Sequence, residues 1–228
     1  MTTEYKDQLF NGDVVMQPLL FKLCADSLRT FTNKNHGIKL KAAHAHELVA
    51  AFFGYSSKNA MLADIKYPIT NLAQAEIIVM TSDNVVNRRR KNLQGLSSEL
   101  PDSYTLGESI YEPLFSDEWW ASPYPPFRDY KKLAEYLVEN NEAYQAAFIF
   151  RHDIPIHHYV DVQVAEKGVL LTVIHASQTS TGEMLGNGKT TINLPRIAGR
   201  IGFSKPQISI EKWTAGARRT LESLGVQS

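Results

Sequence analysis

The stretch from residue 39 to residue 66 constrains the fold most, because several kinds of helix signal agree within it. Apolar residues recur at helical spacing over residues 40–53 and form one face of a helix. Gly54 follows, and glycine commonly ends helices because it tolerates the left-handed conformation. One of the two serines after Tyr55 can cap a second helix, which Pro68 prevents from continuing far. The stretch therefore predicts a helical hairpin.

The spacing within this hairpin is also typical of a helix-turn-helix motif. Ala50 precedes Gly54 by four residues and Ala60 follows it by six, so small side chains stand where two helices would cross. The second helix would then present Lys58 and Asn59 to phosphates or base edges. The same spacing is equally consistent with a hairpin that serves packing alone.

The segments His46-Glu47-Leu48, Gly54-Tyr55 and Ala60-Met61-Leu62-Ala63 follow the pattern of a known domain. Over about residues 17–65 the chain resembles the small helical domain of glyoxalase-related proteins from bacteria and plasmids. The resemblance implies a bacterial origin, and this origin includes proteins that are encoded on mobile elements. It implies no enzymatic activity, because the metal ligands of a true glyoxalase belong to a different, β-rich fold.

The periodicity of the apolar residues changes along the chain. Helical spacing occurs over residues 18–32 and again over residues 130–144. Residues 159–164 alternate apolar and polar side chains, and residues 169–174 are apolar and β-branched, which indicates two strands. The four-residue link between them ends in Gly168 and predicts a β-hairpin.

Three further elements are expected in the C-terminal half from their composition. They are a strand over residues 146–150, a long polar loop over residues 177–191 and a helix over about residues 209–224. Within the expected loop, Gly182 and Gly188 are separated by five residues before Lys189-Thr190, where a phosphate-binding loop requires four.

These expectations combine into an α+β fold. We expect a helical N-terminal unit that contains the helix-turn-helix-like hairpin, and a C-terminal antiparallel sheet with flanking helices. The expected boundaries are residues 1–97 for the N-terminal unit, 98–126 for an aromatic and proline-rich connector, and 127–228 for the C-terminal unit.

Charge is segregated although the chain is neutral overall. Residues 99–142 carry ten acidic and three basic side chains, whereas residues 189–228 carry seven basic and two acidic ones. This asymmetry suits a polyanion, a partner protein, or contact between the two segments. The expected nucleic-acid-binding residues are Lys58, Asn59, Arg88, Arg89, Arg90, Lys91, Lys212, Arg218 and Arg219. Arg196, Arg200 and Lys205 belong to the same basic C-terminal segment.

Histidine and carboxylate side chains in the C-terminal half are the catalytic candidates. His157, His175 and Asp161 lie on or beside the two expected strands. Adjacent residues of a strand point to opposite faces, so at most one of His157 and His158 can join such a site. Zinc-ligand spacings are absent from the sequence, and we expect no metal and no cofactor.

The sequence favours a cytoplasmic, bacterial nucleic-acid-binding protein with an accessory or regulatory role. The single cysteine, Cys24, fits a reducing compartment, and no apolar run is long enough to span a membrane. One alternative is a protein-interaction or inhibitory module that docks a partner through Trp119 and Trp120. A second alternative is a hydrolytic enzyme that uses the C-terminal sheet.

Overall fold

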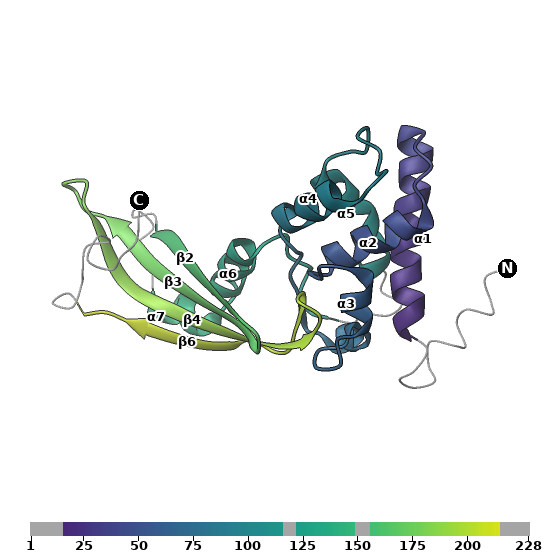
Figure 1. The fold of residues 1–228 in the computed structure, drawn as a ribbon. Coiled ribbons are helices and arrows are strands. Elements are labelled where there is room, and N and C mark those ends of the chain that lie inside the picture. The colour runs from purple at the N-terminus through teal and green to yellow at the C-terminus, as the bar shows by residue number, and fades with distance from the viewer. Residues whose placement is uncertain (1–15, 116–121, 149–155, 215–228) are drawn as a thin grey trace. The chain divides into compact units, whose positions relative to one another are not determined.

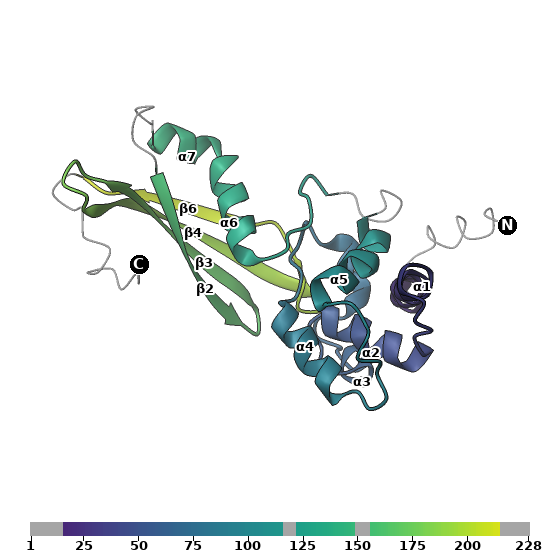
Figure 2. The same ribbon diagram turned by 90° about the horizontal axis from the view of Figure 1, so that it is seen from above.

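Figures 1 and 2 show the fold of the chain in two views. The computed structural model describes residues 16–115, 122–148 and 156–214. Helices make up most of the N-terminal part, and antiparallel strands with two helices make up most of the C-terminal part (Figure 1). The expected α+β class is therefore confirmed.

Contacts divide the chain into two compact units, each described here by itself. The first unit extends to Arg128 and also includes residues 196–204. The second unit comprises residues 129–195 and the residues from Lys205 onward. The first unit is thus assembled from two segments that are distant in the sequence.

The first unit is built around packed helices. Their bounds are α1 (Met16–His36), α2 (Ala42–Phe52), α3 (Lys58–Leu62), α4 (Asp83–Asn92) and α5 (Ser103–Tyr111), with the 3₁₀ helices η1 (Ile69–Gln74) and η2 (Glu112–Phe115). In α1, Phe21, Cys24 and Leu28 are buried at helical spacing and pack into one core with residues of the other helices. Burial raises the pKa of the Cys24 thiol, which therefore stays protonated and packs as a small apolar side chain.

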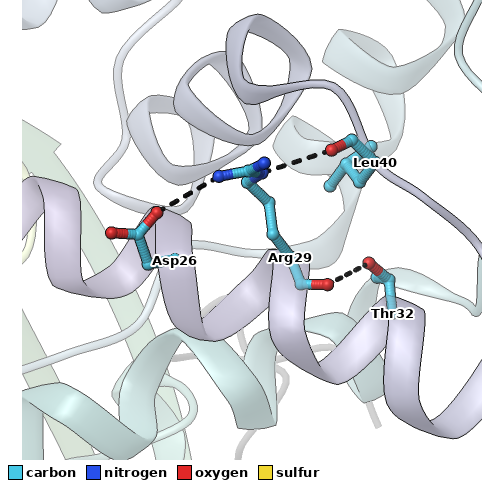
Figure 3. A network of polar contacts seen from close by, with 4 residues as sticks. All are labelled: Asp26, Arg29, Thr32 and Leu40. Carbon is cyan, nitrogen blue, oxygen red and sulfur yellow. Dashed lines mark hydrogen bonds and ion pairs between the residues drawn. The ribbon is translucent and has the colours of Figure 1, made fainter.

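A polar network attaches α1 to the chain that enters α2 (Figure 3). The Arg29 guanidinium donates from Nε to the Leu40 carbonyl oxygen at 3.3 Å and lies 3.4 Å from the Asp26 carboxylate. The hydroxyl of Thr32, which is fully buried, donates to the carbonyl oxygen of Arg29 at 3.1 Å. Arg29 therefore satisfies backbone and side-chain groups at the point where the chain reverses.

The expected hairpin is present in α2 and α3. Gly54, which follows the C-cap residue Phe53 of α2, has a φ of +85°, and the amide of Tyr55 donates to the carbonyl oxygen of Ala50 at 2.9 Å. Ser57 caps α3, because its hydroxyl accepts from the amide of Ala60 at 3.1 Å. Glycine closure and serine capping occur where the sequence indicates them.

A short antiparallel ladder completes the first unit. It consists of β1 (Ile77–Ile78), β5 (Gly202–Phe203) and the last residues of β4 (Met184–Ala198). Ile77 pairs with Phe203, and all four residues of β1 and β5 are buried. The segment from Arg196 to Ser204 therefore contributes to the core of the N-terminal unit.

The expected connector over residues 98–126 is wrong in its central part. Residues 103–115 form α5 and η2, in which Leu106, Ile110 and Leu114 are fully buried. Asp102 caps α5 by accepting from the amide of Thr105 at 2.8 Å. These apolar residues are separated by four positions each, a helical spacing that the neighbouring prolines and aromatic residues obscured.

The second unit is a sheet with two helices on one face (Figure 2). Its elements are α6 (Tyr130–Glu139), α7 (Glu142–Ala147), β2 (Ile156–Ala165), β3 (Gly168–Gln178), most of β4, and β6 (Gln207–Lys212). The strand order is β2-β3-β4-β6, and every pairing is antiparallel. The expected hairpin is confirmed, since β2 and β3 are joined by Glu166-Lys167.

Gly188 in β4 permits close packing under the helices of this unit. A Cβ atom at this position would lie 2.6 Å from the Phe148 ring and 2.3 Å from the Glu211 carbonyl oxygen. Both distances are shorter than van der Waals contact. The ring of Phe148 therefore reaches the sheet only because position 188 lacks a side chain.

Three C-terminal expectations differ from the structure. Residues 146 and 147 lie in α7, which Asn141 caps, and not in a strand. The expected loop over residues 177–191 is mostly strand, because β4 begins at Met184. Residues 209–212 belong to β6 and not to a helix, and the rest of the expected helix beyond residue 214 lies outside the described residues.

Within the described ranges, no helix is both long enough and apolar enough to cross a membrane. The 21-residue α1 has the length, but it carries charged side chains that include Lys22, Asp26 and Arg29.

Candidate nucleic-acid interface

The helix α3 is too short to act as a typical recognition helix. Its five residues span about 7.5 Å, given a rise of about 1.5 Å per residue. Lys58 and Asn59 occupy its first turn, with Asn59 exposed and Lys58 half-buried. These two side chains can contact a polyanion at the helix start, but α3 cannot lie along a major groove as longer recognition helices do.

Glu47 joins α3 to α4. Its Oε2 atom accepts from the backbone amide of Lys58 at 3.1 Å and from the Arg89 guanidinium at 2.6 Å. Both side chains of this ion pair are about one quarter exposed. Arg89 is therefore neutralised by an internal partner, and the expected role of Arg89 in nucleic-acid contact does not fit its position.

The other residues of the basic run divide between packing and solvent. The Arg90 guanidinium donates to the Leu100 carbonyl oxygen at 3.0 Å and to the Ser103 hydroxyl at 3.3 Å, which connects α4 to α5. Arg88 and Lys91 are exposed on α4. Two of the four expected cations in this run thus remain available on the surface.

The turn between α2 and α3 packs directly against the segment that returns from β4. A Cβ atom on Gly54 would lie 2.6 Å from Cβ of Arg200, so Arg200 rests on the glycine. The amide of Gly199 donates to the carbonyl oxygen of Tyr67 at 2.8 Å. These contacts bring an exposed arginine from the C-terminal half to the hairpin of the N-terminal half.

Two more cations lie beside Tyr67, in the segment that follows α3. The Arg196 guanidinium is 5.8 Å from the centroid of the Tyr67 ring, and the Lys66 ammonium is 5.6 Å from it. Both distances allow cation–π attraction. We call Lys66, Tyr67, Arg196 and Arg200 the turn surface.

The acidic residue Asp64 lies beside the turn surface, and its carboxylate accepts hydrogen bonds from neighbouring groups. It accepts from the hydroxyl of Tyr55 at 2.9 Å and from the backbone amides of Lys66 and Tyr67 at 3.1 and 2.9 Å. Burial raises the pKa of the Tyr55 hydroxyl and the bond to Asp64 raises it further, while the positive charges of Arg200 and Arg196 act in the opposite direction. The turn surface therefore carries more positive than negative charge.

The remaining expected contact residues lie elsewhere. Lys212 is exposed in β6 of the second unit, so it does not share an element with the turn surface. Arg218, Arg219, Trp119 and Trp120 lie outside the described residues.

The candidate catalytic residues do not form one site. In the antiparallel register His158 faces His175, and Asp161 faces Thr172, so His175 and Asp161 lie on opposite faces of the sheet. His157 shares the outer face with Asp161 and is exposed, as Asp161 is. The expected grouping of His157, His175 and Asp161 fails because it crosses the sheet.

A different histidine pair is brought together on the helix-covered face. Nδ1 of His158 and Nδ1 of His175 are 3.0 Å apart, and Nε2 of His175 is 2.7 Å from the Thr190 hydroxyl. The rings of Tyr144 and Phe148 pack on His175 at centroid distances of 4.7 and 4.9 Å. His175 is fully buried and closed to a substrate, whereas His158 is half-buried.

Desolvation sets the charge state of this pair. Burial and, to a smaller extent, the neighbouring His158 together lower the pKa of His175 to about 3. The pKa of His158 is also lowered by burial, against the opposing effect of Glu139 and Glu135. Both imidazoles are therefore neutral at neutral pH, and each can serve as donor at one nitrogen and acceptor at the other. Within the described residues, no group of three or more potential metal-ligating side chains is present.

The turn surface includes residues that the sequence pattern did not single out. Arg196 and Arg200 are recognisable as part of a basic segment, but the position of Arg200 beside Gly54 and that of Arg196 beside Tyr67 depend on long-range pairing. The residues next to Tyr67 in the sequence give no indication that it belongs to a binding surface. Its place in the turn surface follows from Lys66 and Arg196, whose cations lie near its ring.

Comparisons with family models, with curated protein sequences and with solved structures find no match to this chain. The resemblance to glyoxalase-related domains therefore stays a prediction from the residues of the hairpin.

Proposed function

We propose that this protein binds nucleic acid as an accessory or regulatory factor, and that the turn surface holds backbone phosphates. One observation carries the proposal: Arg200 rests on Gly54 of the α2–α3 turn, and Arg196 and Lys66 both lie at the ring of Tyr67 in the segment that follows α3. Cations from two distant parts of the chain thus meet at the element whose spacing resembles a helix-turn-helix. Arginine suits this task because its planar guanidinium matches the geometry of phosphate oxygens.

The chemistry of the turn surface favours contact with the phosphate backbone over recognition of base edges. The α3 helix is five residues long and offers few side chains that could enter a groove. Phosphate contacts provide affinity that is independent of sequence and strongly dependent on salt. We therefore expect weak sequence preference and salt-sensitive binding.

The test is a binding titration of the full chain with a fluorescent DNA duplex and with a labelled single strand. Fluorescence anisotropy measured between about 50 mM and about 200 mM salt gives the slope of log affinity against log salt. For the double variant Lys66→Gln/Arg200→Gln, we expect weaker binding and a slope on duplex smaller by about 2, because two phosphate contacts are lost.

A matched control removes two cations elsewhere. Lys131 and Lys167 are exposed in the second unit, and Lys131→Gln/Lys167→Gln changes the net charge by the same amount. We expect this control to bind almost as the unchanged chain does. Equal weakening by both double variants would mean that net charge alone causes the affinity. Absence of salt-sensitive binding by the unchanged chain would reject the proposal and favour a protein partner.

A further inference from the structure

The β2 strand forms an exposed edge of the sheet in the second unit. Among the described residues it pairs with β3 alone, in an unbroken antiparallel register over residues 156–165. Figure 2 shows β2 at the border of the sheet, with β3 on one side of it. A long edge strand presents unpaired backbone donors and acceptors that can accept another strand.

Apart from the charge of Asp161, β2 itself carries none of the features that usually protect such an edge. Natural edges are blunted by short length, lysine, proline or a bulge. This strand is ten residues long, contains neither lysine nor proline, and shows no register shift against β3. The opposite edge, β6, is six residues long and carries Glu211 and Lys212, which are exposed. The two edges of one sheet therefore differ in how strongly they discourage pairing.

Apolar side chains on the helix-covered face of β2 are also incompletely covered. Val160, Val162 and Val164 share that face, because they oppose the buried residues of β3. Val162 is 37% exposed and Val164 is 63% exposed. An added strand would cover these valines and would form hydrogen bonds with the backbone of β2. Burial of apolar surface and backbone pairing therefore both favour the addition of a strand.

We propose that the added strand is β2 of a second copy of this chain. A two-fold axis perpendicular to the sheet makes the strands antiparallel and keeps the helix-covered faces on the same side. With the axis at Val160, residues 156–164 of one copy pair with residues 164–156 of the other. This inference concerns the second unit and is independent of the proposed nucleic-acid binding.

The side chains of β2 complement themselves in this register. On the helix-covered face, Val160 meets Val160 and Val164 meets Ile156 of the second copy. On the outer face, Asp161 meets Tyr159, whose hydroxyl can donate to the carboxylate. A shift of the axis to Asp161 would place two carboxylates directly opposite each other, which is unfavourable. Charge therefore disfavours the register centred on Asp161 and is compatible with the one centred on Val160.

Disulfide trapping tests the interface and its register in the full chain. Cys24 is the natural cysteine and is buried, so an introduced cysteine on β2 is the accessible thiol. In Val160→Cys the two copies place their Cα atoms about 5 Å apart, within the range that a disulfide spans. We expect rapid formation of a covalent dimer on non-reducing gels under mild oxidation.

Two single variants provide the matched controls. Val164→Cys and Ile156→Cys each place the two thiols of a symmetric dimer about 27 Å apart, because eight residues of strand separate them. Each variant alone is expected to stay monomeric on the gel, and an equimolar mixture is expected to cross-link. Equal cross-linking of all variants would indicate random collision and overturn the register. No cross-linking of Val160→Cys would overturn the interface.

A second measurement avoids any effect of oxidation. Sedimentation of the unchanged chain at increasing protein concentration is expected to show a monomer–dimer equilibrium. Tyr159→Asp and Tyr159→Lys both remove the same ring, but they place opposite charges against Asp161 of the second copy. We expect the dissociation constant of the Asp variant to exceed that of the Lys variant by about tenfold, since each dimer contains two such pairs. A strictly monomeric unchanged chain, or equal constants for the two variants, would contradict the proposal.

Discussion

His175 is buried with no carboxylate of the described residues in hydrogen-bond contact, and this position determines what the residue can do. Its ring nitrogens contact His158 and Thr190, and aromatic rings cover it. A neutral imidazole satisfies both contacts, whereas a second proton would place an uncompensated charge in an apolar layer. The residue is therefore better suited to holding the sheet against its helices than to acid–base catalysis.

The histidine pair makes the stability of the second unit dependent on pH. The pKa of His175 in the folded state, about 3, lies below the value of about 6.5 in an unfolded chain. The unfolded state therefore binds more protons below pH 6.5, and stability falls as the pH decreases. We expect a loss of up to about 1.4 kcal/mol per pH unit between about pH 6 and about pH 5.

Urea unfolding followed by the fluorescence of Trp213 measures this effect, in a chain where Trp119 and Trp120 are changed to Phe. In the variant His175→Phe the stability should lose most of its pH dependence, because the imidazole whose pKa is lowered in the folded state is absent. His157→Gln is the matched control, since His157 is exposed on the other face, and it should keep the full dependence. A similar slope in His175→Phe would assign the effect to other groups.

At the scale of elements, a single carboxylate secures the junction of α2, α3 and α4. Glu47 accepts from the start of α3 and from Arg89 of α4. The Nε atom of Arg89 is buried and has no hydrogen-bond partner in the described part of the chain. The bond to Glu47 therefore provides most of the compensation for the partly buried guanidinium.

Removal of Glu47 should destabilise the first unit more than removal of an exposed carboxylate. We expect Glu47→Ala to lower the free energy of unfolding by about 1–3 kcal/mol, because a partly buried cation loses its partner. Asp26→Ala is the control: the Asp26–Arg29 pair is about half exposed and should contribute less than about 0.5 kcal/mol. Urea titrations monitored by circular dichroism at 222 nm compare the two variants. Equal losses would contradict the assigned role of Glu47.

Elements with complete local signals were predictable, and elements that depend on distant partners were not. Gly54 and Ser57 bound the hairpin through contacts within a few residues, and the β2–β3 turn is equally local. In contrast, residues 209–212 form a strand because β4 pairs with them. The alternation of Ile208 and Ile210 carries a strand signal, which the longer helical spacing of the following residues masked.

At the scale of the whole molecule, the first unit requires a segment that follows most of the second unit in the sequence. Arg196–Ser204 supplies β5 and the end of β4, and Ala198 and Ile201 are fully buried in the first core. The side-chain amide of Asn71 donates to the carbonyl oxygen of Ile197 across 126 positions of sequence. The two units are therefore interleaved along the chain.

A fragment of residues 1–128 should be less stable than the same region in the full chain. Without residues 196–204, the buried strand β1 loses its pairing with β5 and the apolar contacts of Ala198 and Ile201. We expect a lower midpoint and reduced cooperativity in thermal unfolding measured by circular dichroism. A control fragment that carries residues 196–204 on a flexible linker of about a dozen residues should recover much of the loss. Identical unfolding of the two fragments would show that the returning segment contributes little.

The sequence by itself determined the α+β class, the capped helical hairpin and the β2–β3 hairpin. Each of these depends on neighbouring residues whose conformational preferences agree. Only the tertiary structure decided that Arg200 meets the hairpin at Gly54, that His175 pairs with His158 and not with Asp161, and that β2 forms an edge. These outcomes depend on strand register and on long-range pairing. Local preferences do not encode either, because shifting a strand by one residue exchanges the two faces of a sheet.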